Sequence, residues 1–234
     1  MRLKNKRLLI EYRNVDIYQD EKIILKGVNF TADAGEFIYI IGKVGAGKSS
    51  LLKTMYCELD IESADCANVL DHNLLTIKRR QIPQLRKGIG IIFQDFQLLH
   101  DRTVYDNLRF VLRATGWRDK ASVDDRINEV LDAVGMSDAI NKMPHQLSGG
   151  EQQRIAISRA LLNTPKIIIA DEPTGNLDVE TASNIVSLLK SISQKGTAVI
   201  MSTHNIPMID KYPGIVYSCQ NGTLEEQDID KMSM

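Results

Sequence analysis

The sequence has few cysteines, no excess of charge and no long apolar run. Its three cysteines, Cys57, Cys66 and Cys219, are odd in number and lack CxxC spacing, which argues against a disulfide framework and against a zinc site. The 29 Lys and Arg residues against 30 Asp and Glu give a net charge of -1, so the basic excess typical of nucleic-acid-binding proteins is missing. We therefore expect reduced thiols and no nucleic-acid partner.

The apolar runs are also too short for a membrane span. The longest, such as 37–41, 89–93 and 167–170, fall far below the roughly 20 residues that cross a bilayer. The basic residues between Arg2 and Arg7 are followed by only three apolar residues, too few for the apolar region of a signal peptide. These absences predict a chain that does not itself cross a membrane and that stays in the cytosol.

What is present is the pattern of a large globular domain in which strands and helices alternate. The chain has 234 residues, of which 43% are hydrophobic, enough for a sizeable core. Apolar runs and spacing predict strands at 23–30, 36–41, 89–93, 167–170 and 197–201, and helices at 47–55, 104–114, 123–134 and 182–193. This alternation predicts an α/β fold with a mainly parallel sheet.

Two regions depart from the alternation. Residues 57–87 have no clear period, and we expect short strands and turns there. Residues 103–163 are mainly helical and predict an inserted helical lobe, in which Ser122 is the candidate N-cap of the second helix and Gly135 ends it.

A phosphate-binding motif lies between the second predicted strand and the first predicted helix. The pattern GxxxxGK[ST] is specific in this strand-to-helix context. Its glycines let backbone N–H groups turn toward phosphates, the lysine adds a positive charge, and the serine hydroxyl is a ligand for Mg²⁺. The predicted nucleotide-binding residues are Gly42, Lys43, Val44, Gly45, Ala46, Gly47, Lys48, Ser49 and the adjoining Ser50.

Two carboxylates follow the apolar strand 167–170. An isolated Asp-Glu pair at a strand end is often a solvated loop, but together with the phosphate loop it indicates two functions. Asp171 is predicted to hold the Mg²⁺ shell, and Glu172 to polarise the water that attacks the γ-phosphate.

A third motif, LSGGEQQR, occupies residues 147–154. Ser148 and Glu151 have the spacing of a capping box at the start of a helix. Gly149 and Gly150 are poor helix formers, and they suit a first turn whose N–H groups approach a phosphate closely. Since one helix N-terminus is already assigned to the nucleotide, a second suggests a nucleotide held between two copies of the protein.

Together these motifs resemble those of ATP-binding-cassette (ABC) ATPases, and the resemblance covers nearly the whole chain. It implies one nucleotide-binding domain over residues 1–234, with a RecA-like P-loop core, an antiparallel β subdomain and a helical subdomain inserted at about 97–160. It also implies roles for further residues. These are Gln94 as a catalytic residue and Mg²⁺ ligand, His204 as the γ-phosphate switch, Asp178 in the D-loop at the dimer seam and Tyr18 stacking on adenine.

Within the family, residues 93–107 and the run ADEPTGNLD at 170–178 resemble the FtsE group of cell-division ATPases, with the LolD and MacB groups nearby. This resemblance implies a Mg-dependent ATPase that dimerises on binding ATP. It further implies an integral FtsX-like permease as partner, a position on the cytoplasmic face of the plasma membrane, and regulation of cell division and peptidoglycan hydrolysis. Residues 94–105 are the expected coupling surface.

Several alternatives remain open at this stage. A DNA-repair ATPase of the same superfamily needs a long coiled coil, for which the interval from Gln94 to Ser148 is too short. A P-loop kinase leaves residues 147–154 and His204 without a function. A lipoprotein-release or export transporter ATPase, and a nucleotide-dependent scaffold with little turnover, both fit the motifs.

Overall fold

The structure, a computed structural model, describes residues 8–227, so the basic residues 2–7 considered for a signal peptide lie outside the described part. Its central sheet has six strands in the order β10-β9-β3-β8-β7-β6. Five of them run parallel, and β10 pairs antiparallel to β9 at one edge. The strands are β3 (Phe37–Ile41), β6 (Ile89–Ile92), β7 (Ile167–Ala170), β8 (Ala198–Thr203), β9 (Ile215–Gln220) and β10 (Thr223–Gln227).

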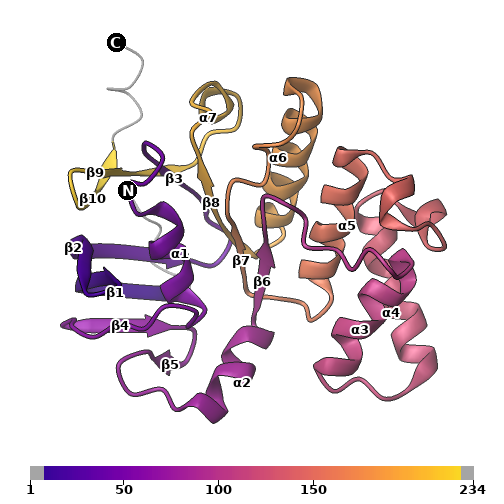
Figure 1. The fold of residues 1–234 in the computed structure, drawn as a ribbon, viewed down its shortest axis with the longest axis horizontal. Helices are drawn as coiled ribbons and strands as arrows, with labels where there is room; N and C mark the ends of the chain where they lie inside the picture. Colours follow the sequence, from indigo (N-terminus) through magenta and orange to yellow (C-terminus); the bar gives the residue numbers. More distant parts are fainter. Residues whose placement is uncertain (1–7, 228–234) are drawn as a thin grey trace.

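A second, antiparallel sheet has four strands in the order β2-β1-β4-β5. Its strands are β1 (Leu8–Gln19), β2 (Lys22–Asp33), β4 (Cys66–Val69) and β5 (His72–Asn73). Figure 1 shows this sheet at one end of the molecule, with the parallel strands in the middle.

Seven α-helices connect and cover the sheets within the described residues. They are α1 (Lys48–Met55), α2 (Ile82–Lys87), α3 (Val104–Ala114), α4 (Lys120–Ala133), α5 (Gly149–Leu161), α6 (Val179–Gln194) and α7 (Pro207–Lys211). Helices α3, α4 and α5 gather at the end opposite the antiparallel sheet (Figure 1). Within residues 8–227, no helix combines the length and the apolar character needed to cross a bilayer.

Two hydrophobic cores form on opposite faces of the parallel sheet, because neighbouring residues of a strand point to opposite faces. In β7, Ile168 and Ala170 pack into the core shared with α3 to α6. Ile167 and Ile169 pack into the core shared with α1 and the antiparallel sheet. Burial on both faces explains the uninterrupted apolar sequence of this strand. Asp171 and Glu172 follow its carboxyl end, which lies between β8 and the edge strand β6.

The predicted α/β class with a mainly parallel sheet is confirmed, and so is the capping box at Ser148. The predicted start of the second lobe helix is wrong. This helix, α4, begins at Lys120, and its N-cap is Asp119, whose carboxylate accepts the N–H of Ser122 at 2.8 Å. Segment 57–87 holds the expected short strands, but it also contains α2.

Candidate active site

The phosphate loop connects β3 to α1, and its glycines adopt backbone conformations that other residues avoid. Gly45 and Gly47 have φ of 79° and 99°, in the left-handed region. A Cβ on Gly47 would also lie 2.8 Å from Cγ2 of Ile24 in β2. The neighbouring antiparallel sheet therefore contributes to the requirement for glycine at this turn.

Lys48, the first residue of α1, is almost completely buried under the loop. Its Nζ donates to the backbone oxygens of Gly42 and Lys43 at 3.0 and 3.2 Å. The same Nζ lies 3.3 Å from Oε1 of Glu172. A buried ammonium needs such partners, because an unpaired buried charge is strongly unfavourable.

Glu172, which follows the end of β7, lies between the side chains of Lys48 and His204. Its other carboxylate oxygen, Oε2, lies 3.2 Å from Nδ1 of His204, which is more than half exposed. Glu172 has a left-handed φ of 45°, an uncommon conformation for a non-glycine residue and one that is frequent at functional sites. The carboxylate is thereby fixed between the phosphate loop and the segment that follows β8.

A buried serine on β8 holds both the side chain of Asp171 and the backbone of Glu172. The hydroxyl of Ser202 donates to Oδ1 of Asp171 at 2.6 Å and accepts the backbone N–H of Glu172 at 2.8 Å. Ser202 is fully buried. One hydroxyl therefore sets the relative orientation of both acids.

These groups surround a hollow of about 510 Å³. The described residues that line it include most of the predicted nucleotide-binding and acidic residues, together with two that the sequence did not suggest, Gln19 and Ile24. The full lining is Gln19, Ile24, Val44, Gly45, Gly47, Lys48, Ser49, Ser50, Gln94, Asp171 and Glu172. The hydroxyl of Ser50 donates to Oε1 of Gln19 at 3.2 Å, which ties the start of α1 to β1.

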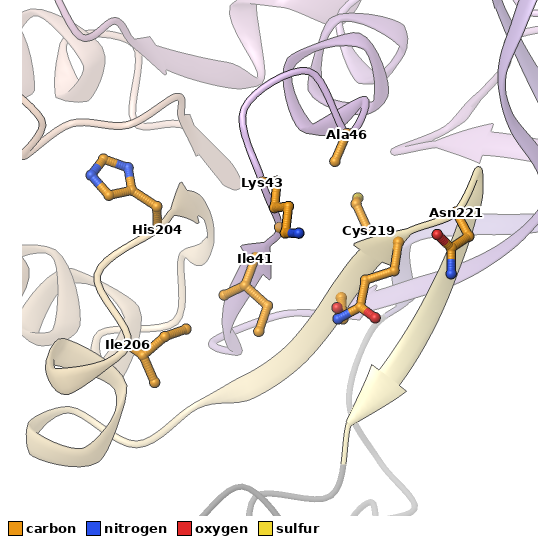
Figure 2. Close-up of a pocket in the computed structure, with 10 residues that line it drawn as sticks. Ile41, Lys43, Ala46, His204, Ile206, Cys219 and Asn221 are labelled. Atoms are coloured by element: carbon orange, nitrogen blue, oxygen red, sulfur yellow. The ribbon is translucent and has the colours of Figure 1, made fainter.

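Other predicted residues lie beside this hollow. Gly42, Lys43, Ala46 and His204 line a neighbouring cavity on the other side of the phosphate loop (Figure 2). Tyr18 is a residue of β1, half-buried and paired with Ile23. It is not among the described residues that line the hollow, although its neighbour Gln19 is.

Gln94 follows β6 and is held by an asparagine on the segment after β7. The Nδ2 of Asn176 donates to the backbone oxygen of Gln94 at 3.2 Å, and Nε2 of Gln94 donates to Oδ1 of Asn176 at 3.4 Å. The motif at 170–178 contains Asn176 but does not predict this contact. The pair of hydrogen bonds joins two segments that are 82 residues apart at the edge of the hollow.

The signature residues 148–151 do not line the hollow in the described part of the chain. Ser148 caps α5, because its Oγ accepts the N–H of Glu151 while its own N–H donates to Oε2 of Glu151 at 2.8 Å. These hydrogen bonds keep the pKa of the Glu151 carboxyl below its usual value. Gly150 has a packing reason as well, since a Cβ there would lie 2.5 Å from Cγ2 of Thr181.

Asp178 is the N-cap of α6. Its carboxylate accepts the hydroxyl of Thr181 at 2.6 Å and the N–H of the same residue at 2.9 Å. These hydrogen bonds lower the pKa of Asp178, so this exposed side chain stays anionic at neutral pH.

Comparisons with known proteins agree with the motifs and the geometry. Residues 25–175 match the family described as ABC transporter. The chain is 41% identical over 215 residues to the "Cell division ATP-binding protein FtsE" of Streptococcus pneumoniae serotype 2, covering 92% of this chain and 93% of that protein. It is 42% identical over 207 residues to the protein of the same name from Escherichia coli K12, covering 87% of this chain and 91% of that protein.

Among solved structures, a dimeric ATP-binding cassette in a post-hydrolysis state bound to ADP and Pi is similar, with a TM-score of 0.82 and 31% identity. The match covers 94% of this chain and 99% of that one. The fold is therefore that of an ABC nucleotide-binding domain. The family match, the identity across most of the chain and the arrangement around Lys48 and Glu172 lead to one conclusion: this chain belongs to the ABC transporter family and, within it, to the FtsE type of ATP-binding proteins.

Proposed function

We propose that this chain is the ATP-hydrolysing subunit of an FtsEX-like complex, which couples ATP hydrolysis to a membrane permease and so regulates cell division and peptidoglycan hydrolysis. The observation that carries the proposal is the 41% identity to a cell-division ATP-binding protein across 92% of the chain. The paired acids opposite the phosphate loop support the catalytic part of the proposal.

In this proposal, binding of ATP brings two copies together. The phosphate loop of one copy and residues 148–151 of the other enclose each nucleotide. The signature residues lie away from the hollow of their own chain, and the N-terminus of a capped helix suits a phosphate. A similar cassette is dimeric with ADP and Pi bound.

The residues present fit an Mg-nucleotide. Ser49, Gln94 and Asp171 offer a hydroxyl, an amide and a carboxylate oxygen in one hollow, and such hard oxygen ligands suit Mg²⁺. Among residues 8–227 no cluster of three or more His, Cys, Asp and Glu side chains has the geometry of a metal site. This agrees with an ion held by one carboxylate together with phosphates and waters. When bound, Mg²⁺ neutralises charge that develops on the phosphates.

Different side chains of the chain have different roles in ATP hydrolysis. Lys48 exchanges its backbone acceptors for phosphate oxygens, and the loop N–H groups hold the β- and γ-phosphates. Glu172 accepts a proton from, or orients, the attacking water. His204, whose Nδ1 lies 3.2 Å from Oε2 of Glu172, holds the γ-phosphate. Positioning and charge stabilisation dominate such chemistry.

We place the membrane partner on residues 94–105 and the groove beside them. Phe96 and Gln97 both have left-handed φ values, and the half-buried Arg159 of α5 donates to both of their backbone oxygens. A cavity of about 380 Å³ lies between this segment, α2 and α3. We propose that residues 97–160 form the helical subdomain of a single nucleotide-binding domain, held by the permease at the cytoplasmic face of the plasma membrane.

Two experiments test the proposal. Phosphate release by the purified chain with Mg-ATP is expected to be measurable and to be lost in Glu172→Gln, whereas Glu225→Gln on the exposed β10 is the matched control. Affinity purification of tagged Glu172→Gln from detergent-solubilised native membranes with Mg-ATP is expected to recover one FtsX-like permease. Recovery of lipoproteins or of permeases with large external domains would instead indicate a transporter, and absence of turnover with the permease present would indicate a scaffold.

A further inference from the structure

The cavity on the far side of the phosphate loop, which we call the loop cavity, is distinct from the nucleotide hollow, because no described residue lines both. It measures about 480 Å³, within the range of about 300–1,000 Å³ that is typical of small-molecule sites. The phosphate loop, the segment after β8 and the end of β9 form its walls (Figure 2). The loop cavity is therefore large enough for a ligand of its own.

A buried hydroxyl without a hydrogen-bond partner lines this cavity. Ser218 lies on β9 opposite Ile41 of β3, and it is only 3% exposed. Within residues 8–227 its Oγ is one of three buried side-chain N or O atoms that form no hydrogen bond. Buried hydroxyls are nearly always hydrogen-bonded, because an unpaired one is unfavourable. The Oγ of Ser218 therefore indicates that a polar group binds in the loop cavity.

The other polar groups of the loop cavity are exposed. They are the side chains of Lys43 and His204 and the amides of Gln220 and Asn221, and no acidic side chain of the described residues lines the cavity. The Nδ1 of His204 already lies 3.2 Å from a carboxylate oxygen of Glu172. Lys43 therefore supplies the positive charge at the edge of the cavity, where an anionic group is favoured.

The remaining lining of the loop cavity is mainly apolar. Figure 2 shows Ile41, Ala46 and Ile206 around it, together with Cys219. Burial raises the pKa of the Cys219 thiol to about 11, so this side chain is uncharged at neutral pH. Such a lining favours a ligand with an apolar body and few polar groups.

From these features we infer that the loop cavity binds a small hydroxy-carboxylate whose two polar ends are separated by an apolar body. Its carboxylate pairs with the ammonium of Lys43 at the edge, its body covers Ile41 and Ile206, and its hydroxyl hydrogen-bonds to Oγ of Ser218. This site goes beyond the proposed function, because the nucleotide binds on the other side of the phosphate loop.

The first test uses 3-(4-hydroxyphenyl)propionate, which has a carboxylate and a hydroxyl at opposite ends of an apolar body. Isothermal titration calorimetry with the nucleotide-free chain is expected to show one saturable site, with a dissociation constant of about 1 mM or lower. Tyramine has the same hydroxyphenyl group but an ammonium in place of the carboxylate, and it is expected to bind at least about tenfold more weakly. Tyramine binding as tightly as the carboxylate, or no saturable binding of the carboxylate, would overturn the inference.

The second test assigns the contact with the hydroxyl. Because 3-phenylpropionate lacks the hydroxyl, it is expected to bind about fivefold more weakly than the first probe, the effect of one hydrogen bond. In Ser218→Ala this difference is expected to disappear, whereas Ser191→Ala, which removes a hydroxyl bonded to Leu188, is expected to keep it. Equal binding of the two compounds to the unsubstituted chain, or a difference that persists in Ser218→Ala, would show that Ser218 does not bind the hydroxyl.

The stability of Ser218→Ala tests the basis of the inference. Since Oγ of Ser218 has no partner within the described residues, its removal breaks no hydrogen bond, and the urea midpoint is expected to stay the same or rise. A clear fall of the midpoint would show that the hydroxyl has a partner in the folded chain and needs no ligand.

The third test locates the ligand by blocking the cavity. Ile206→Trp places a larger side chain at the loop cavity, and Leu99→Trp, outside it, is the control because both residues are 38% exposed. The affinity for 3-(4-hydroxyphenyl)propionate is expected to fall at least about tenfold in Ile206→Trp and to change by less than about twofold in Leu99→Trp. Equal affinities would place the ligand elsewhere and contradict the inference. None of these measurements requires ATP or a dimer, so their outcome is independent of the proposed function.

Discussion

The hydroxyl of Ser202 donates to Oδ1 of Asp171 at 2.6 Å while it accepts the N–H of Glu172 at 2.8 Å. One buried side chain on β8 therefore holds the two acids that follow β7 in a fixed orientation. The contact crosses between adjacent parallel strands, so the sheet itself positions the groups that we assign to metal binding and to water activation.

Ser202→Ala is expected to lower the ATPase rate about tenfold and to raise the Mg²⁺ concentration needed for half-maximal activity. The change leaves the N–H of Glu172 without its acceptor, and an unsatisfied buried group costs about 1–3 kcal/mol. The Mg²⁺ dependence of phosphate release measures the effect. Ser191→Ala, which removes a helix hydroxyl bonded to Leu188, is the control. Equal Mg²⁺ dependence in the two variants would show that Ser202 has only a structural role.

Glu172→Gln is expected to retain nucleotide while losing turnover by about 10²-fold or more, the size of a general-base contribution. The amide keeps the shape of the side chain but cannot accept the proton of the attacking water. It also removes the charge that now faces Lys48 at 3.3 Å, so nucleotide affinity is expected to rise or stay the same. Filter binding of labelled ATP and phosphate release measure the two effects separately. Turnover at the parent rate would contradict the assigned role.

The phosphate loop, the apolar strand followed by Asp171 and Glu172, and the capping box at Ser148 were predictable. Each is encoded by a few adjacent residues in a fixed context. The catalytic contacts of Ser202 and Asn176 were not predictable, because they arise where strands and loops distant in sequence meet. No local pattern marks a serine near the end of an apolar strand as the partner of the Asp171 carboxylate and of the Glu172 N–H.

The sequence pattern does not predict strand β1 (Leu8–Gln19), for a different reason. The alternation of apolar and polar residues in β1 breaks near Asn14, which has a left-handed φ of 51°. The pairing of β1 with β2 also shifts register between Tyr12 and Val15. Such bulges interrupt the two-residue period on which strand prediction depends. The N-cap of α4 was misplaced because Ser122 and Asp119 are both good caps, and only the structure shows which carboxylate or hydroxyl receives the N–H groups.

Gly150→Ala is expected to destabilise the protein by about 1–3 kcal/mol through overpacking. A Cβ at this position would lie 2.5 Å from Cγ2 of Thr181, a methyl group on α6. Thr181→Ser removes that methyl group and keeps the hydroxyl that donates to Asp178. The double variant is therefore expected to recover most of the lost stability, measured by urea unfolding as a double-mutant cycle.

The activity of the same double variant separates packing from nucleotide contact at the signature. If Gly150 serves the partner's phosphate, ATPase activity stays low after stability returns. If activity returns together with stability, the glycine is present for the packing of α5 against α6 alone, and the phosphate contact must come from other residues of the turn.

The thiol of Cys219 offers a test of burial beneath the phosphate loop. Burial raises its pKa to about 11, and the nearby Lys48 ammonium opposes only part of this shift. In the folded protein the alkylation rate is therefore expected to keep rising with pH up to 10 without a plateau. At pH 8 the thiolate fraction, and with it the alkylation rate, should be about 100-fold below that of the urea-unfolded chain.

Because the pKa of Cys219 is higher in the folded than in the unfolded chain, this thiol stabilises the fold below about pH 9, and the contribution is lost as the pH rises toward 11. A variant with Cys57→Ser and Cys66→Ser reports the single thiol by mass spectrometry. A plateau near pH 9 in the folded protein would show that the thiol is solvated and that the cavity it lines beside the phosphate loop is open to water.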